Sequence, residues 1–319
     1  MRQIDPFQLE SLVPATMDLE QRILLAERCR DSDVIPKVPN AGCVMTRNDG
    51  VRVQVMHNGL AMLADGYYGN WMTRLIEKCR GHHEPQEELV FHEVVKHLSE
   101  CATMLELGGF WAYYSLWFLR NQPSRKAIVL EPDPAHRAVG EVNARLNNLR
   151  PCFVSGFIGS GPADQESFVT EESGKLLLPR FSVAQLLVDQ GIERLDLLHC
   201  DTQGAEVDVL TSCVELFERR LISWAFVSTH AHQISGDPLT HQRCLALLQN
   251  AGAKIVAEHD VYESFSGDGL IVAHFGQLSS DWFLPQLSRN RYSESYFRNP
   301  LYDLAELRKS ATSELPTRE

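Results

Sequence analysis

The sequence lacks the features that mark several specialised classes of protein. Its eight cysteines include no Cys-x-x-Cys pair, and both zinc knuckles and disulfide frameworks need closer grouping. No apolar run approaches the 18 or so residues of a transmembrane helix, so we expect no membrane span. The first 30 residues hold five acids, which argues against a secretory signal. We therefore expect a cytoplasmic protein with mostly buried, reduced cysteines.

Basic charge is also scarce. The 30 Lys and Arg residues stand against 42 Asp and Glu residues, which gives a formal net charge of −12. Because binding to a phosphate backbone requires clustered cations, we expect no nucleic-acid partner. Apolar residues at 44% and charged residues at 23% are typical of a globular protein. The length of 319 residues suits about two domains, or one α/β domain with extensions.

The first 83 residues predict an N-terminal extension or cap. Residues Val51–Met56 alternate as a strand does, and the turn signal His57–Gly59 separates them from Leu60–Ala64, so a β-hairpin is expected there. Helices are expected over Leu19–Cys29 and from Pro85, with acids in its first turn, to about Leu98.

Residues 84–277 predict a Rossmann-like α/β domain. Short apolar runs alternate with amphipathic stretches, which is typical of βαβ units and a mostly parallel, seven-stranded sheet with helices on both faces. The expected strands are Thr103–Leu107, Ala127–Leu130, Cys152–Ile158, Leu195–Cys200, Ile222–Thr229, Lys254–Ala257 and Gly269–His274. Residues 278–319 are expected to form a C-terminal extension whose last ten residues are mobile.

A glycine turn follows the first of these strands. The strand ends at Glu106, and Gly108 and Gly109 then allow close approach to the backbone. Glu131, 25 residues after Glu106, ends the second strand, where an acid can accept both ribose hydroxyls. We expect these four residues to line a nucleoside cofactor. A generic turn followed by a helix-capping acid is the alternative.

The same turn favours S-adenosylmethionine over NAD. A dinucleotide site would carry Gly-x-Gly-x-x-Gly, but Phe110 and Ala112 stand where further glycines would be needed. Glu106 would repel a pyrophosphate, whereas it would attract a sulfonium and an α-amino group. A nicotinamide oxidoreductase is therefore disfavoured.

A second polar group follows the fourth strand. His199 and Asp201 alternate and so share a face, and ligands of open α/β sheets bind at the carboxyl ends of strands. Glu206 follows in the first turn of a helix. The alternative is that Asp201 caps this helix and Glu206 complements its dipole.

Histidines end the next strand. His230 and His232 alternate there and could act as metal ligands or as a base beside Asp201. The glycine-bordered Asp268 could reach the same rim, although a simple turn explains it almost as well. Four other histidines are interpreted as ordinary surface residues: His83, His97, His136 and His241.

These motifs resemble the FkbM-type methyltransferases over roughly residues 84–275. The resemblance rests on residues 106–115, on Glu131–Pro134 with Asn143 and Asn147, and on the block from His199 to Glu206. It implies a class I, S-adenosylmethionine-dependent fold and O-methylation of a sugar, glycan or secondary-metabolite hydroxyl. Phe110 and Ala112 replace the Asn and Gly of the family's first motif.

The resemblance implies roles for the site residues. Glu106, Gly108, Gly109, Glu131 and Asp201 would line the cofactor. His199, Asp201 and His230 would supply the base and the acceptor clamp. A divalent ion, Mg or Mn, held by Asp201, His230 and His232 could lower the pKa of the acceptor hydroxyl.

Other assignments stay open at this stage. Tyr67, Tyr68 and Trp71 are candidates for stacking on an acceptor, whereas Trp117 is expected in the core. A homo-oligomer is left open. The alternative function is a binding module that retains the fold without catalysis.

Overall fold

The computed structural model describes residues 17–159, 161 and 163–298. The predicted mobile C-terminal end lies outside these residues. None of the helices in the described ranges is both long enough and apolar enough to cross a membrane. All eight cysteines are free, and four are buried while three are exposed, so fewer are buried than expected.

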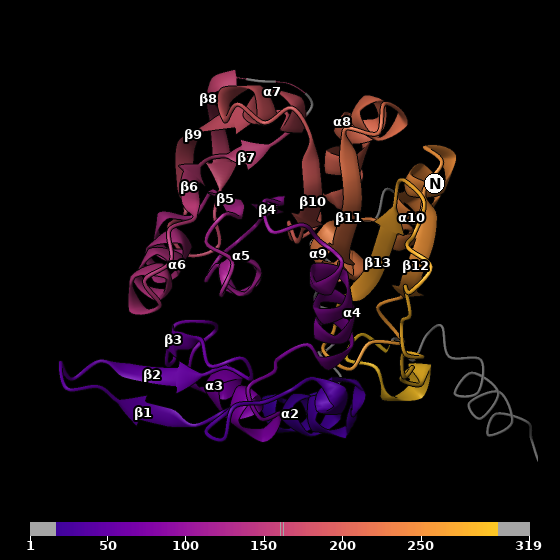
Figure 1. The fold of residues 1–319 in the computed structure, drawn as a ribbon. Helices are drawn as coiled ribbons and strands as arrows, with labels where there is room; N and C mark the ends of the chain where they lie inside the picture. The colour runs from indigo at the N-terminus through magenta and orange to yellow at the C-terminus, as the bar shows by residue number, and fades with distance from the viewer. Residues whose placement is uncertain (1–16, 160, 162, 299–319) are drawn as a thin grey trace, which may run out of the picture.

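A seven-stranded sheet forms the centre of the protein (Figure 1), in the order β12-β13-β11-β10-β4-β5-β6. β13 is antiparallel to both neighbours, and the other strand pairs are parallel. This is the predicted Rossmann-like class I methyltransferase fold. The strands are β4 (Thr103–Leu107), β5 (Lys126–Glu131), β6 (Cys152–Ser155), β10 (Leu195–Cys200), β11 (Ile222–Thr229), β12 (Lys254–His259) and β13 (Gly269–His274).

Helices cover both faces of the sheet, because its strands are apolar on both sides. Successive residues of β4 show the division: Met104 packs in one hydrophobic cluster with α4 and α5, while Leu105 packs in the other with α7, α8 and α10. The helices are α4 (Pro85–Lys96), α5 (Tyr113–Leu119), α6 (Pro134–Leu146), α7 (Val183–Asp189), α8 (Glu206–Glu218), α9 (His232–Ser235) and α10 (Thr240–Asn250).

The N-terminal extension contains the predicted hairpin. β2 (Arg52–Val55) pairs antiparallel with β3 (Ala61–Leu63), and β1 (Val44–Thr46) adds a third strand that the sequence did not predict. The hairpin docks on α6, since the side-chain oxygens of Asn143 and Asn147 accept hydrogen bonds from Leu63 N and Ala61 N at 2.7 and 2.8 Å. The helical parts are α2 (Leu19–Arg28), η1 (Asp31–Val34) and the unpredicted α3 (Asn70–Lys78).

The predicted strand Cys152–Ile158 is wrong as a single element. Gly156, at φ 148°, separates β6 from β7 (Phe157–Ile158), and a Cβ on it would lie 2.6 Å from Pro179 O. β7 joins a separate sheet, in the order β7-β9-β8, with β8 (Ala163–Val169) and β9 (Lys175–Phe181). This small sheet was not predicted.

The segment after β13 packs on the sheet rather than leaving it. Leu278, Trp282 and Leu284 contact the hydrophobic cluster that contains α4 and α5. The short helix η2 (Tyr292–Glu294) follows.

Candidate functional site

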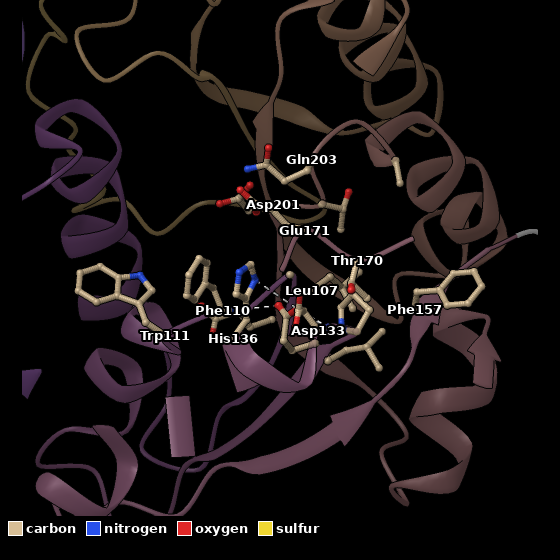
Figure 2. Close-up of a pocket in the computed structure, with 18 of the residues that line it drawn as sticks. Leu107, Phe110, Trp111, Asp133, His136, Phe157, Thr170, Glu171, Asp201 and Gln203 are labelled. Atoms are coloured by element: carbon tan, nitrogen blue, oxygen red, sulfur yellow. Dashed lines mark hydrogen bonds and ion pairs between the residues drawn. The ribbon is translucent and has the colours of Figure 1, made fainter. Parts of the chain in front are cut away.

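A cavity of about 360 Å³ opens at the carboxyl ends of β4, β5 and β10, the edge where ligands of open α/β sheets bind. Its volume suits a small molecule. Every residue predicted to bind the cofactor lines it: Glu106, Gly108, Gly109, Glu131 and Asp201. Figure 2 shows Asp201 and Gln203 above the rings of Phe110 and His136, with Phe157 on the opposite side of the view from Trp111.

The glycine turn is held tightly against the neighbouring strand. Gly108 has φ 76° and a Cβ there would lie 1.8 Å from Asp201 O; a Cβ on Gly109 would lie 2.2 Å from Val129 Cγ1. No side chain fits in either place. The glycines are therefore required by the packing of the protein itself as well as by the approach of a ligand.

Phe110 and Ala112 keep the turn in a left-handed conformation, at φ 35° and 60°. Asn and Gly adopt this conformation more easily than Phe or Ala, so each position stores about 1–2 kcal/mol of strain. The Phe110 ring stacks on His136 with 3.5 Å between centroids (Figure 2). His136 and His241 are both buried, so their interpretation as surface residues is wrong.

Two buried acids face the cavity from β4 and β5. Glu106 Oε2 accepts a hydrogen bond from Ser115 N at 3.1 Å, and Glu131 Oε2 accepts one from Phe110 N at 3.0 Å. Burial raises the pKa of each carboxyl to about 7. A nearby cation would restore the charged form and would be bound in return.

Carboxylates dominate the wall of this cavity. Among the described residues that line it are six acids and three histidines, but no Lys or Arg. A pyrophosphate would find no lysine or arginine here to neutralise it, while a positively charged ligand would be stabilised. The acids are Glu84, Glu106, Glu131, Asp133, Glu171 and Asp201.

The turn between β8 and β9 covers one side of the cavity. Asp133 Oδ2 accepts hydrogen bonds from Glu172 N and Ser173 N at 2.7 and 3.1 Å, which ties the turn to the N-terminal end of α6. Burial raises the pKa of Asp133, but these hydrogen bonds outweigh it and hold the pKa below its usual range. Thr170 and Glu171 thereby become cavity residues that the sequence did not predict.

The structure brings His230, Asp201 and Glu206 together. His230 Nδ1 lies 2.9 Å from Glu206 Oε1, and Nε2 lies 3.2 Å from Asp201 Oδ1 and 3.6 Å from Asp268 Oδ1. Burial lowers the pKa of His230, but the surrounding carboxylates outweigh burial and raise it well above its usual range. His230 is therefore an imidazolium, with both nitrogens directed at acids.

The expected metal group of Asp201, His230 and His232 is not assembled among the described residues, because their donor atoms do not all lie within 4.8 Å of one another. His232 begins α9, beyond the end of β11, and no ion pair or hydrogen bond in the described ranges joins its ring to Asp201 or His230. Within those ranges, the one group of three donors close enough to share an ion is His57, His82 and Glu88.

His199 differs from His230 in its protonation state. Its ring is 1% exposed, it lines the cavity, and neither ring nitrogen has a hydrogen-bond partner in the described part of the chain. Nε2 lies 3.5 Å from Glu87 Oε1. Burial lowers the pKa of His199, so its imidazole is neutral at pH 7 and can accept a proton.

His83, interpreted from sequence as a surface residue, is 3% exposed and lines the cavity. Its Nε2 lies 3.0 Å from Glu84 Oε2 and its Nδ1 lies 2.9 Å from Glu88 Oε1. Burial lowers the pKa of His83, but the two carboxylates outweigh this and raise it to about 10. Only the density of polar residues in 80–88 signals this network in the sequence.

The network continues away from the cavity. Tyr113 donates to Glu88 Oε2 at 3.0 Å, and the Tyr113 oxygen lies 3.1 Å from His57 Nδ1. Glu84, His83, Glu88, Tyr113 and His57 thus form one buried chain of hydrogen bonds, which we call the Glu84–His57 chain.

Of the aromatic candidates, Tyr67 and Tyr68 line the cavity and Trp71 does not. Tyr67 stacks on Trp111 with 4.3 Å between centroids. Trp117 is buried in the core, as expected.

The sheet order and the cavity define a class I methyltransferase fold. No protein-family model matches the chain, and no curated protein matches it. Two similar solved structures are a precorrin-6y C5,15-methyltransferase from Geobacter metallireducens (13% identity over 60% of this chain and 87% of that chain, TM-score 0.39) and TrmK of M. capricolum with S-adenosyl-homocysteine (12% identity, 72% and 88%, TM-score 0.38).

Proposed function

We propose that this protein is an S-adenosylmethionine-dependent O-methyltransferase that acts on a hydroxyl of a sugar, glycan or other small metabolite. The observation that carries this proposal is the cavity at the glycine turn, whose described lining has six carboxylates and no Lys or Arg. Such a wall favours a cationic cofactor. The sequence resemblance to FkbM-type enzymes supports the same assignment.

Glu106 and Glu131 divide the recognition of the cofactor. Glu131, at the end of β5, would accept the ribose hydroxyls, as acids at this position do in Rossmann-like sheets. Glu106, beside the Gly108 turn, would attract the ammonium and sulfonium groups. Phe157 and Ile158 supply apolar wall further along the cavity, on the side where the adenine is expected.

His199 is the base in this proposal. The acceptor oxygen attacks the sulfonium methyl group in line, so that the O–C bond forms as the C–S bond breaks and S-adenosylhomocysteine leaves. The hydroxyl proton passes to a ring nitrogen of the neutral His199. Asp201 would clamp the acceptor, and His230 would act as a positioning residue because Glu206 fixes its ring against Asp201.

The first test is calorimetric titration with S-adenosylhomocysteine, with NAD as the control. We expect stoichiometric binding of S-adenosylhomocysteine and none of NAD. Glu131→Gln should weaken binding about tenfold or more, which is typical of losing hydrogen bonds to a charged acceptor. An analogue without the ribose hydroxyls should bind both proteins alike, and equal losses with both ligands would contradict the assigned role of Glu131.

Methyl transfer is tested separately, with radiolabelled S-adenosylmethionine and a panel of sugars and hydroxylated metabolites. Transfer to a hydroxyl supports the enzyme. Binding of the cofactor without transfer to any acceptor would favour the alternative, a binding module that keeps the fold.

A further inference from the structure

A second cavity, of about 680 Å³, lies between the segment 35–38, the hairpin turn, α4 and the end of α5. Four cations line it, Lys37, Lys96, Arg120 and Arg125, against a single acid, Glu100. This balance is the reverse of the first cavity and of the chain as a whole, which carries a net charge of −12. A cationic cavity in an acidic protein favours an anionic ligand.

Several hydrogen-bond donors in this cavity are not fully used by acceptors of the described residues. No acid pairs with Arg120 in the described part of the chain; its guanidinium lies at the hairpin turn, where Nη2 would be 3.0 Å from a Cβ on Gly59. In the same turn, Asn58 Nδ2 is buried without an acceptor among the described residues. Lys37 Nζ donates to two carbonyl oxygens, Ser32 O and Ile35 O, which leaves its third proton free.

Arg125 has a different part in this wall. Its guanidinium donates to four backbone carbonyls, at Ser99, Phe118, Val95 and Leu98. These bonds hold α4 and α5 together and thereby fix the shape of the cavity. The donors left for a ligand are therefore Arg120, Lys37 and Asn58.

We propose that this second cavity binds the phosphate group of a small molecule. A guanidinium, an ammonium and an amide reach it from separate elements, and a tetrahedral oxyanion offers acceptors in several directions, unlike a planar carboxylate. The two negative charges of a phosphate offset most of the cationic excess, since four cations face one acid. The volume leaves room for the molecule that carries the phosphate.

The second cavity is distinct from the first. His57 lines the second cavity, while His83 and Glu84 line the first, and the Glu84–His57 chain fills the protein between them. The phosphate site therefore does not depend on the cofactor or on the proposed function.

The test is calorimetric titration of the full chain with inorganic phosphate at constant ionic strength, alone and with saturating S-adenosylhomocysteine. We expect one saturable site that S-adenosylhomocysteine does not displace. Arg120→Gln should weaken phosphate binding about tenfold or more. The matched control is Arg219→Gln, which removes an exposed charge paired with Glu215 on α8 and should leave phosphate binding unchanged.

Lys37→Gln is a second variant that should also weaken phosphate binding, and it provides a test if Arg120→Gln does not fold. Thermal unfolding shows whether each variant is folded. Absence of saturable phosphate binding would overturn the proposal, as would equal weakening by Arg120→Gln and Arg219→Gln. If S-adenosylhomocysteine fails to bind while phosphate binds, the proposed function fails and the phosphate site stands.

Discussion

The ring of His230, at the end of β11, is held by Glu206, the first residue of α8, through a 2.9 Å contact between Nδ1 and Oε1. Glu206 Oε1 also accepts hydrogen bonds from Gly204 N and Thr202 Oγ1 at 2.9 and 3.1 Å. One carboxylate therefore fixes both the loop that carries Asp201 and the histidine that faces it. Neither helix capping by Asp201 nor a dipole effect of Glu206 accounts for this arrangement.

Glu206→Gln should lower the free energy of unfolding by about 3–5 kcal/mol, because it leaves the buried His230 imidazolium short of a partner. Urea unfolding measures this. The matched control is Glu215→Gln on the same helix, whose pair with Arg219 is exposed and should contribute under about 0.5 kcal/mol. Equal effects of the two substitutions would contradict the buried ion pair.

The same pair makes stability depend on pH. The pKa of Glu206 is lowered from 4.5, since His230 outweighs burial, so its contribution is full above pH 4.5 and is lost as the pH falls through the folded-state value. The pKa of His230 is raised from 6.5, so its contribution is full below pH 6.5 and declines above it. The stabilisation that Glu206→Gln removes should be largest between these two values.

Gly108→Ala should destabilise the fold by more than 3 kcal/mol, because the added Cβ would lie 1.8 Å from Asp201 O and buried backbone cannot move away cheaply. The control is Gly50→Ala, at φ 83° with no atom within 4 Å of the added Cβ. That substitution isolates the conformational penalty of about 1 kcal/mol. Similar melting temperatures for the two variants would argue against the tight contact of β4 with β10.

Binding of S-adenosylmethionine at pH 6 should release protons. The pKa of Glu106 is about 7 in the folded protein, above the ordinary 4.5, so the carboxyl is protonated at pH 6 and its contribution to stability is lost as the pH rises toward 7. A cation placed beside it lowers the pKa and expels the proton. Calorimetry in MES and in imidazole measures the release as a difference in apparent enthalpy.

The number of protons released on binding should decrease in Glu106→Gln. It should fall to zero at pH 9 in the wild-type protein, where the Glu106 carboxyl is already charged. Identical enthalpies in both buffers at pH 6 would remove Glu106 from the cofactor site.

The sequence predicted the central sheet well because its strands are buried on both faces. β4, β10, β11 and β13 are rich in apolar residues, and their predicted bounds agree with the structure. The residues predicted to bind the cofactor line one cavity, because they stand at the ends of neighbouring strands. β8 and β9 were missed because exposed and half-buried residues alternate along them and their partners are set by long-range pairing.

The histidines show where sequence reasoning stops. His83 and His136 were interpreted as surface residues, but His83 is paired with Glu84 and Glu88 and His136 stacks on Phe110. The density of polar residues in 80–88 is the local signal for His83, whereas the partner of His136 lies 26 residues earlier in the chain. His230 was placed correctly beside Asp201, but its protonation state depends on Glu206 and Asp268, which arrive from other elements. Charge state is a property of the assembled site.

His199→Gln should reduce methyl transfer by about 10²–10⁴-fold if His199 is the base. Because burial lowers the pKa of His199 below 6.5, the wild-type rate should stay level near pH 7 and fall only in more acidic solution. Labelled-methyl transfer over a pH series measures both effects. The control His97→Gln changes a histidine outside the cavity lining, and binding of S-adenosylhomocysteine should be unchanged in both variants. Full activity of His199→Gln at every pH would assign the base elsewhere.

The Glu84–His57 chain has a consequence for how the molecule unfolds. The predicted boundary between extension and main domain falls between His83 and Glu84, whose side chains are 3.0 Å apart. If the extension detached, the buried Glu88, which is 0% exposed, would lose its histidine partners His57, His82 and His83. Asn143 and Asn147 would lose their hydrogen bonds to the hairpin. Such a separation exposes charges that the remainder cannot compensate. The extension and the sheet should therefore melt together in one cooperative transition.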